Sequence, residues 1–515
     1  MFVCFTFTVI DCGREREVRR NKRTSTSILV TDWCSKANTK QRAGRAGRVV
    51  SSQDIVPFLF IEWLMCNNLT PRIVPYLLIL FLEWFFILRT QQPGLCLKLF
   101  SSSTAESMKA TSEPELKRVP LEEVCLSILA SGLGKNCEEF LGQAPQPPSE
   151  ESVTAALSVL EDVGAVTSAR NVLTPLGQHL SKLPVDVRLG KMLIFGALFQ
   201  CLDTVVTIAA SLSCKSPFAT YLHDAALAQA KHKEFYDPNS DFITLCNVWD
   251  GYHNARGKSY KAGRQYCQAN YLNPASMHEI DTTKKDFLNL LCNIGFISKQ
   301  TQQGYHGSSS SSAAATAWDT DAINRHAKNW PLMHAIVFAG LNPNVARLES
   351  PSSSGSSSSS SAYTLWHKTQ QLYFHRTSVN AKKKRFPNDH TWVVFFEKFG
   401  TPTRTSISTT CFLSNSLPLV LFSTGSFVVQ HLARTLVVDD WMEIPMAAQI
   451  GVMLQQLRLQ IEVLLLDLVD TTPFSSSSTL RPDDRKVALQ SERTAIITGI
   501  VDIISRTTST KEYYK

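Results

Sequence analysis

The sequence predicts a multidomain chain in which an α/β segment is followed by a mainly helical region and then a small β-barrel. Residues 5–11 (FTFTVID) alternate and then run apolar, as a buried strand of an α/β sheet does. From Leu116 onward, apolar residues recur at spacings of three and four, which is the helical period. Beyond residue 370, short apolar stretches recur at intervals typical of a small barrel.

Composition sets wide bounds on function. A chain of 515 residues is long enough for about three or four domains, and 44% hydrophobic residues can bury several cores. The net charge of +8 permits a nucleic-acid partner without requiring one. The 13 cysteines form no C-x-x-C pair, which argues against a zinc site or a disulfide framework and for a reducing compartment. The apolar start lacks a basic region and a cleavage site, so it reads as a strand rather than a signal peptide.

The octamer Q-R-A-G-R-A-G-R at residues 41–48 is the most specific motif. Its glycines let the backbone pass close to a ligand, and its arginines offer planar forks to phosphate oxygens. An exposed basic loop or a targeting run could have a similar composition. With V-I-D-C-G at 9–13 and S-K-A-N at 35–38, however, the octamer resembles the sixth motif of the DEAH-box RNA helicases of superfamily 2.

This resemblance implies roles for single residues. Gln41, Arg45 and Arg48 would contact the nucleotide phosphates, and Arg45 and Arg48 would act as catalytic arginine fingers. Arg42 would serve structure or interdomain pairing.

An apolar segment at residues 50–90 interrupts the resemblance. The family's P-G-x-C-x-x-L-[FY] strand follows the arginine motif closely, whereas here it occupies Gln92–Phe100, about forty residues later. The segment reads as a membrane anchor, a genuine insertion or a translated intron. The apolar run at 74–88 is shorter than the roughly 20 residues of a membrane span and carries Glu83. The family sequence resumes cleanly on both sides, which favours a translated intron.

Later phrases extend the resemblance. A helix containing A-L-x-x-L before Gly164-Ala165 and the phrase L-T-P-L-G at 173–177 are similar to the family's winged-helix domain. Residues 183–218 resemble the entry to its helical ratchet domain, and the wording of 240–296 is similar to the long DEAH-box proteins linked to translation and structured mRNA. The implied order is: 1–49, end of the second RecA-like domain; 50–90, insertion; 91–115, last RecA-like strand and linker; 116–182, winged helix; 183–305, ratchet; 306–330, low-complexity linker; 331–480, OB-fold with a serine-rich insertion at 351–362; 481–515, tail.

Within the barrel region we expect strands at Leu372–Phe374, Trp392–Phe396, Val420–Phe422 and Leu436–Val438. A final amphipathic helix follows and is expected to turn one apolar face to the core. That face comprises Ile450, Met453, Leu454, Leu457, Ile461 and Leu464.

Candidate RNA-binding residues lie in the same region. The resemblance implies RNA contacts by His375, Ser378, Lys382, Lys383, Lys384, Arg385, Arg404 and Thr405. The family's H-P-S-S-V phrase is altered here, because Arg376 and Thr377 replace its proline and first serine. The Lys382–Arg385 run could equally be a solvated loop or a nuclear-localisation-like patch.

The sequence contains neither a G-x-x-x-x-G-K-[ST] phosphate loop nor a D-E-A-H box, and Ser131–Asn136 is only a decoy. We therefore expect a C-terminal fragment of an ATP-dependent RNA helicase that cannot hydrolyse ATP alone. ATP and Mg²⁺ would bind in the intact enzyme, and no site for them, or for another metal, is complete in this chain. The expected partners are single-stranded or structured RNA and ribosomal or ribonucleoprotein components, in the cytoplasm or alternatively the nucleus. Membrane attachment is disfavoured. The alternative function is a non-catalytic RNA- or protein-binding module.

Overall fold

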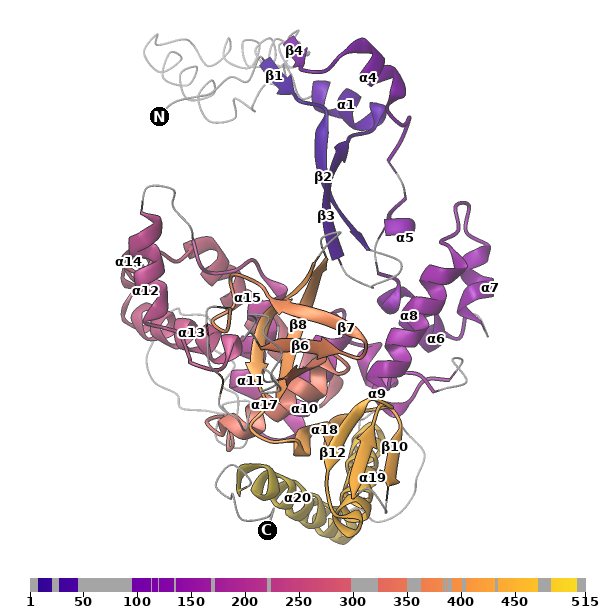
Figure 1. The fold of residues 1–515 in the computed structure, drawn as a ribbon, viewed down its shortest axis with the longest axis vertical. Coiled ribbons are helices and arrows are strands. Elements are labelled where there is room, and N and C mark those ends of the chain that lie inside the picture. The colour runs from indigo at the N-terminus through magenta and orange to yellow at the C-terminus, as the bar shows by residue number, and fades with distance from the viewer. Residues whose placement is uncertain are drawn as a thin grey trace, which may run out of the picture. The chain divides into compact units, whose positions relative to one another are not determined.

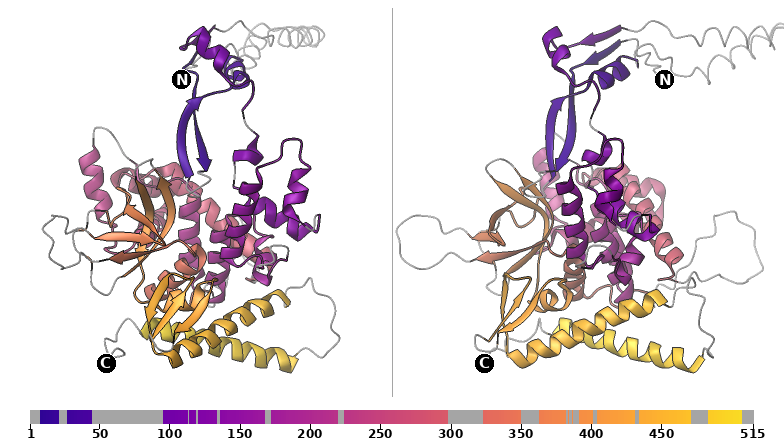
Figure 2. Two further views of the ribbon diagram at one scale, coloured as in Figure 1. Left: turned by 45° about the vertical axis from the view of Figure 1, so that its right-hand side comes forward. Right: turned by 90° about the vertical axis from the view of Figure 1, so that its right-hand side faces the viewer.

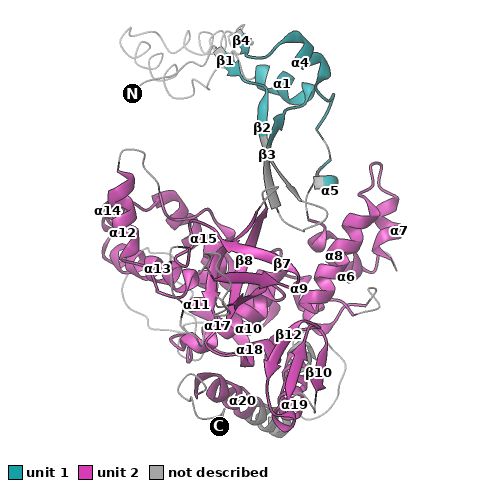
Figure 3. Cartoon of the chain, in the orientation of Figure 1, with its two compact units in different colours: residues 1–20, 28–119 teal, residues 21–27, 120–515 magenta. Residues whose placement is uncertain are grey.

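The computed structural model divides the chain into two compact units, coloured separately in Figure 3. Unit 1 comprises residues 1–20 and 28–119, and unit 2 comprises residues 21–27 and 120–515. The structure describes residues 8–20, 27–44, 95–112, 114–118, 120–133, 136–167, 172–219, 224–297, 323–349, 363–381, 383, 386, 391–400, 404–430, 434–470 and 483–506.

Unit 1 is built on a parallel strand pair. Strand β1 (Thr8–Asp11) lies beside β4 (Leu95–Lys98), and the register runs from Thr8 opposite Leu95 to Asp11 opposite Lys98. The strand predicted at residues 5–11 is thus present over its described part. The strand predicted after Gln92 joins the same sheet, although a long segment separates the two in sequence.

The rest of unit 1 consists of short elements. Strands β2 (Arg14–Arg20) and β3 (Ser27–Trp33) are hydrogen-bonded neighbours. Helix α1 (Lys36–Ala43) begins after Ser35, whose Oγ accepts a hydrogen bond from the Asn38 amide at 3.1 Å. The remaining helices are α4 (Ser102–Ser107) and α5 (Glu115–Arg118).

The segment at 50–90, for which three interpretations were given, lies outside the described residues. The serine runs at 308–313 and 352–361 lie outside them too. No helix in the described part of the chain is long and apolar enough to cross a membrane.

A small helical region opens unit 2. The apolar positions of the predicted A-L-x-x-L helix are buried, with Ala156 and Leu160 fully inaccessible, whereas Val124, at a predicted helical position from Leu116 onward, is 38% exposed. Val166 and Leu173 form an antiparallel bridge after α8 (Glu150–Val163). Gly164 ends the longest helix at φ +83°, a left-handed conformation that favours glycine. The helices are α6 (Glu122–Ser131), α7 (Cys137–Gly142), α8 (Glu150–Val163) and α9 (Pro175–Leu180).

A larger helical region follows. Helices α10 and α17 pack against each other and are apolar on nearly every side, which places them in the core. The Lys191 side chain of α10 is buried, and its Nζ donates to the Val163 carbonyl at 2.8 Å, at the end of α8. The helices are α10 (Val187–Leu198), α11 (Leu202–Ser213), α12 (Ala225–Lys233), α13 (Asp241–Lys258), α14 (Tyr260–Ala269), α15 (Pro274–Ile294) and α17 (Trp330–Leu341).

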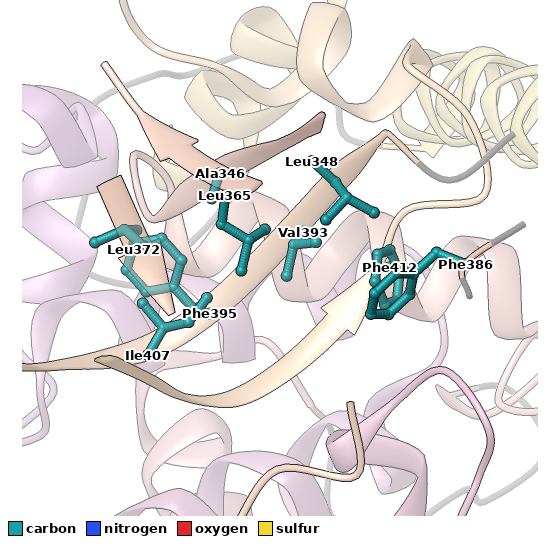
Figure 4. Packing of buried hydrophobic residues seen from close by; sticks show 9 residues of the cluster. All are labelled: Ala346, Leu348, Leu365, Leu372, Phe386, Val393, Phe395, Ile407 and Phe412. Carbon is teal, nitrogen blue, oxygen red and sulfur yellow. The ribbon is translucent and has the colours of Figure 1, made fainter. Parts of the chain in front are cut away.

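Five strands of unit 2 form the barrel (Figure 1). They are ordered β8-β5-β6-β7-β9, and an antiparallel β8–β9 pairing closes the ring. Alternating side chains fill its interior, where Phe386 and Phe412 pack with ring centroids 5.2 Å apart (Figure 4). The strands are β5 (Val345–Glu349), β6 (Thr364–His367), β7 (Gln370–Phe374), β8 (Trp392–Gly400) and β9 (Thr405–Phe412).

Two predictions near the C-terminus are wrong in detail. Val420–Phe422 belongs to helix α18 (Leu417–Phe422), because Pro418 suits a first helical turn and a short apolar run does not distinguish a buried strand from a buried helix. Leu436–Val438 lies in a separate antiparallel sheet rather than in the barrel. That sheet has the order β10-β11-β12, with strands β10 (Phe427–Gln430), β11 (Thr435–Val438) and β12 (Met442–Pro445).

Helix α19 (Ala448–Asp470) packs against β10 and β11 of this sheet, as Figure 2 shows. Its predicted apolar face is buried at Leu454, Ile461 and Leu464, but Met453 is 72% exposed. The residues assigned to a tail include helix α20 (Asp483–Arg506), which contacts α17.

Candidate nucleic-acid interface

An arginine and a tyrosine meet where β7 and β9 run side by side. These strands are parallel, with Tyr373 opposite Ser406. Arg404 directly precedes β9, and its guanidinium carbon lies 4.0 Å from the centroid of the Tyr373 ring. Arg404 is exposed and Tyr373 is half-buried. The cation–π contact therefore holds the planar, positively charged guanidinium of Arg404 at the barrel surface.

His375 continues this surface at the end of β7. Its amide donates to the Ile407 carbonyl at 2.9 Å, and its ring centroid lies 5.6 Å from that of Phe399, which is 37% exposed. The His375 Nδ1 lies 2.7 Å from the Thr377 hydroxyl and accepts from the Thr377 amide at 3.4 Å. Burial, aided by the Arg376 charge, lowers the pKa of His375, which favours the neutral ring. We call Tyr373, His375, Phe399 and Arg404 the barrel edge.

A buried carboxylate joins the barrel to the helical region. Asp241 is the first residue of α13, and its Oδ2 accepts the Ser378 hydroxyl at 2.7 Å, the Thr410 amide at 2.7 Å and the Thr410 hydroxyl at 3.1 Å. Its Oδ1 accepts the Val379 amide at 2.8 Å. Burial raises the pKa of Asp241, and these hydrogen bonds offset part of that effect. We call Asp241, Ser378, Val379 and Thr410 the carboxylate junction.

Lys383 extends the carboxylate junction. Its Nζ donates to the Asn239 side-chain oxygen at 3.0 Å and to the Pro238 carbonyl, just before α13. Burial lowers its pKa. The structure therefore gives Ser378 and Lys383 packing partners inside unit 2, a role that their residue types did not reveal. Lys382, Lys384 and Arg385 lie outside the described residues.

In unit 1 the arginine motif can be placed only at its start. Gln41 is exposed on the last turn of α1. Arg42 is paired within the unit, since its guanidinium donates to Asp11 Oδ1 at 3.0 Å and lies 3.5 Å from Glu15 Oε2. Arg45 and Arg48 lie outside the described residues, so their nucleotide contacts rest on sequence alone. No group of metal-ligating side chains occurs in the part of the chain that the structure describes.

Comparisons with known proteins match this architecture. The model of the ratchet-like helicase associated domain (HA2) matches residues 186–245, and the model of the oligonucleotide/oligosaccharide-binding (OB) fold matches residues 333–425. The chain is 32% identical over 487 residues to the ATP-dependent RNA helicase dhx29 of Xenopus laevis, covering 94% of this chain and 31% of that protein. The chain is a relative of the DEAH-box RNA helicases.

Two further relatives agree. The DExH-box ATP-dependent RNA helicase DExH4, chloroplastic, of Arabidopsis thaliana is 31% identical over 90% of this chain and 30% of its own length. The ATP-dependent DNA/RNA helicase DHX36 of Bos taurus is 29% identical over 96% of this chain and 42% of its own length. The chain thus spans less than half of each of these helicases.

The regions of this chain that match the two family models contain both the barrel edge and the carboxylate junction. The barrel edge lies wholly in the OB-fold match, whereas the carboxylate junction connects the HA2 match to the OB-fold match. Sequence reasoning named His375 and Arg404 but missed Tyr373 and Phe399. The available signal was that each lies in a short strand rich in aromatic residues and close in sequence to basic residues. It also missed Asp241, for which the Ser240-Asp241 start of a helix was the available signal.

Proposed function

We propose that this chain is the RNA-handling part of an ATP-dependent RNA helicase of the DEAH-box class. The observation that supports it is the barrel edge, where Arg404 lies over Tyr373 beside His375 and Phe399 in the region matching the OB-fold model. Aromatic rings stack on bases and arginines attract the phosphate backbone, and neither contact depends strongly on base identity. Such a surface suits single-stranded RNA.

Single residues follow from this proposal. His375, Arg404 and Thr405 would contact the strand, together with Lys382, Lys384 and Arg385. Ser378 and Lys383 would hold the OB region against the ratchet helices through Asp241, Asn239 and Pro238. Thr405 also stabilises the barrel edge, because its hydroxyl accepts a hydrogen bond from the Gln370 side-chain Nε2 at 3.0 Å.

The arginine motif would supply nucleotide contacts in the intact enzyme, with Gln41, Arg45 and Arg48 on the phosphates. ATP with Mg²⁺ supplies the free energy for stepping when it is bound there. Unit 1 contributes a scaffold for this motif, since Arg42 is tied to Asp11 and Glu15. Ribosomal or ribonucleoprotein components would be further partners, in the cytoplasm or the nucleus.

The test measures RNA binding by the 515-residue chain with a fluorescein-labelled oligouridylate of about 20 nucleotides, followed by anisotropy across a salt series. We expect binding that weakens with salt, and a double variant, His375→Ala with Arg404→Ala, that binds about tenfold more weakly at an unchanged melting temperature. If the folded chain does not bind the oligouridylate at low salt, the proposal is contradicted.

A second measurement separates the helicase from a non-catalytic binding module. It uses the protein expressed from the longest transcript of the gene. RNA-stimulated ATP hydrolysis and strand separation support the helicase. RNA binding that is indifferent to ATP supports the module.

A further inference from the structure

The turn between α13 and α14 is unusually basic. Residues 251–278 contain Arg256, Lys258, Lys261 and Arg264 and no aspartate or glutamate. Helix α13 begins at the barrel with Asp241 and ends at Lys258. Its 18 residues span about 27 Å at 1.5 Å per residue, so the basic turn is well separated from the barrel. Figure 1 shows α14 at the margin of unit 2.

The side chains of this turn face solvent. Lys258, Lys261 and Arg264 are exposed, and none of them forms an ion pair with another described residue. Tyr260, the first residue of α14, is 72% exposed. An aromatic ring this exposed between three unpaired cations makes no contribution to the core, and we infer that its role lies at the surface.

Arg256 stabilises the turn through contacts with both helices and with Asp281. Its Nη1 donates to the Tyr252 hydroxyl at 2.9 Å, and its guanidinium carbon lies 5.9 Å from the Tyr260 ring centroid. Its Nη2 lies 3.5 Å from Asp281, which also accepts from Lys285 at 2.9 Å. The buried Asp281 carboxylate is therefore paired with Arg256 and Lys285 rather than with the three outer cations.

The two helices are held closely together. A Cβ on Gly263 would lie 3.2 Å from the Arg256 Cβ, and a Cβ on Gly251 would collide with the Tyr266 hydroxyl. The Ser259 hydroxyl accepts the Ala262 amide at 3.0 Å and caps α14. Because the turn is built tightly, it presents Tyr260 and the cations without further ordering.

We propose that this turn is a second contact for single-stranded RNA, in addition to the barrel edge. Lys258, Lys261 and Arg264 bind phosphates, and Tyr260 stacks on a base. The combination of spaced cations with an exposed ring fits a nucleic-acid strand, whose charges and π-faces alternate. An acidic peptide would use the cations but not the ring. The inference rests on the proposed function, because it assumes that the chain binds RNA.

The experiment compares the full chain with two variants, using the same labelled oligouridylate across a salt series. The triple variant Lys258→Ala, Lys261→Ala, Arg264→Ala should bind about tenfold more weakly, and the slope of log Kd against log salt should fall by about 2, or 0.7 per lost phosphate contact. Tyr260→Ala should bind about fivefold more weakly with an unchanged slope, and Tyr260→Phe should bind as the parent does.

A matched triple variant, Lys117→Ala, Lys182→Ala, Arg506→Ala, removes three exposed cations elsewhere and should leave the slope unchanged. Parental affinity and slope in the turn variants overturn the inference alone, and point to a protein partner instead. Absence of RNA binding in the parent overturns the proposed function as well. Tyr260→Ala keeps the test decisive if the triple variant misfolds, since the ring it removes is exposed.

Discussion

The carboxylate junction and the barrel edge use similar residues for different purposes. At the junction, Ser378 and Lys383 donate hydrogen bonds to Asp241 and Asn239. At the barrel edge, His375 and Arg404 lie beside aromatic rings. All four were predicted RNA contacts from sequence. The comparison shows that a polar residue in a binding motif can instead hold the binding domain in place. Mutations in the two sets should therefore have separate effects on stability and on RNA affinity.

The largest expected effect lies in the carboxylate junction. Asp241→Ala leaves the Val379 and Thr410 amides without an acceptor, and the Ser378 and Thr410 hydroxyls, 2.9 Å apart, keep only one acceptor between them. We expect a loss of about 3–5 kcal/mol in the free energy of unfolding of unit 2, measured by urea denaturation.

Asp250 provides the control on the same helix, because its side chain is exposed. Asp250→Ala should change stability by less than about 0.5 kcal/mol. Equal effects of the two alanine variants would mean that the hydrogen bonds to Asp241 do not stabilise the junction.

Much of the architecture was predictable because its signals are local. Helical spacing identified α8, whose predicted apolar positions are buried. The strand at residues 5–11 and the strand after Gln92 were both predicted, and their described parts, β1 and β4, pair with each other. The short run at Val420–Phe422 was misassigned, since hydrophobicity alone does not separate a strand from one helical turn with Pro418 at its start.

The candidate site was less predictable because it depends on long-range contacts. The Ser378–Asp241 bond joins residues 137 positions apart, and no local pattern shows which side of Ser378 faces inward. Tyr373 was missed for the same reason, since Arg404 reaches it only through the β7–β9 pairing.

A buried histidine adds a test of barrel stability through pH. His367 on β6 donates from Nδ1 to the Val345 carbonyl at 2.6 Å, and burial lowers its pKa to about 4. Between that value and the ordinary 6.5, only the unfolded chain takes up the proton. Stability is therefore fully present above pH 6.5 and falls as pH drops toward 4.

The expected loss from His367 alone is about 2 kcal/mol between about pH 7.5 and about pH 5. His367→Gln keeps a donor for Val345 but does not titrate, so its stability should fall less over this range. Urea denaturation at both pH values measures the difference. Comparing the parent with the variant also cancels the opposing contributions of Asp241 and Asp439, whose pKa values burial raises. Identical pH dependence in the two proteins would show that His367 protonates freely in the folded state.

The smallest and most discriminating effects compare one cation beside the carboxylate junction with one cation of the barrel edge. Lys383→Ala removes the donor to Asn239 and Pro238, and should lower stability by about 1–2 kcal/mol while RNA affinity stays within about twofold. Arg404→Ala removes the plane over Tyr373, and should weaken RNA binding about fivefold while stability changes by less than about 0.5 kcal/mol. Thermal melts and anisotropy on both proteins give the four values. If Lys383→Ala weakened RNA binding as strongly as Arg404→Ala without a loss of stability, Lys383 would leave its partners to bind RNA. The residues beside the carboxylate junction would then belong to the interface.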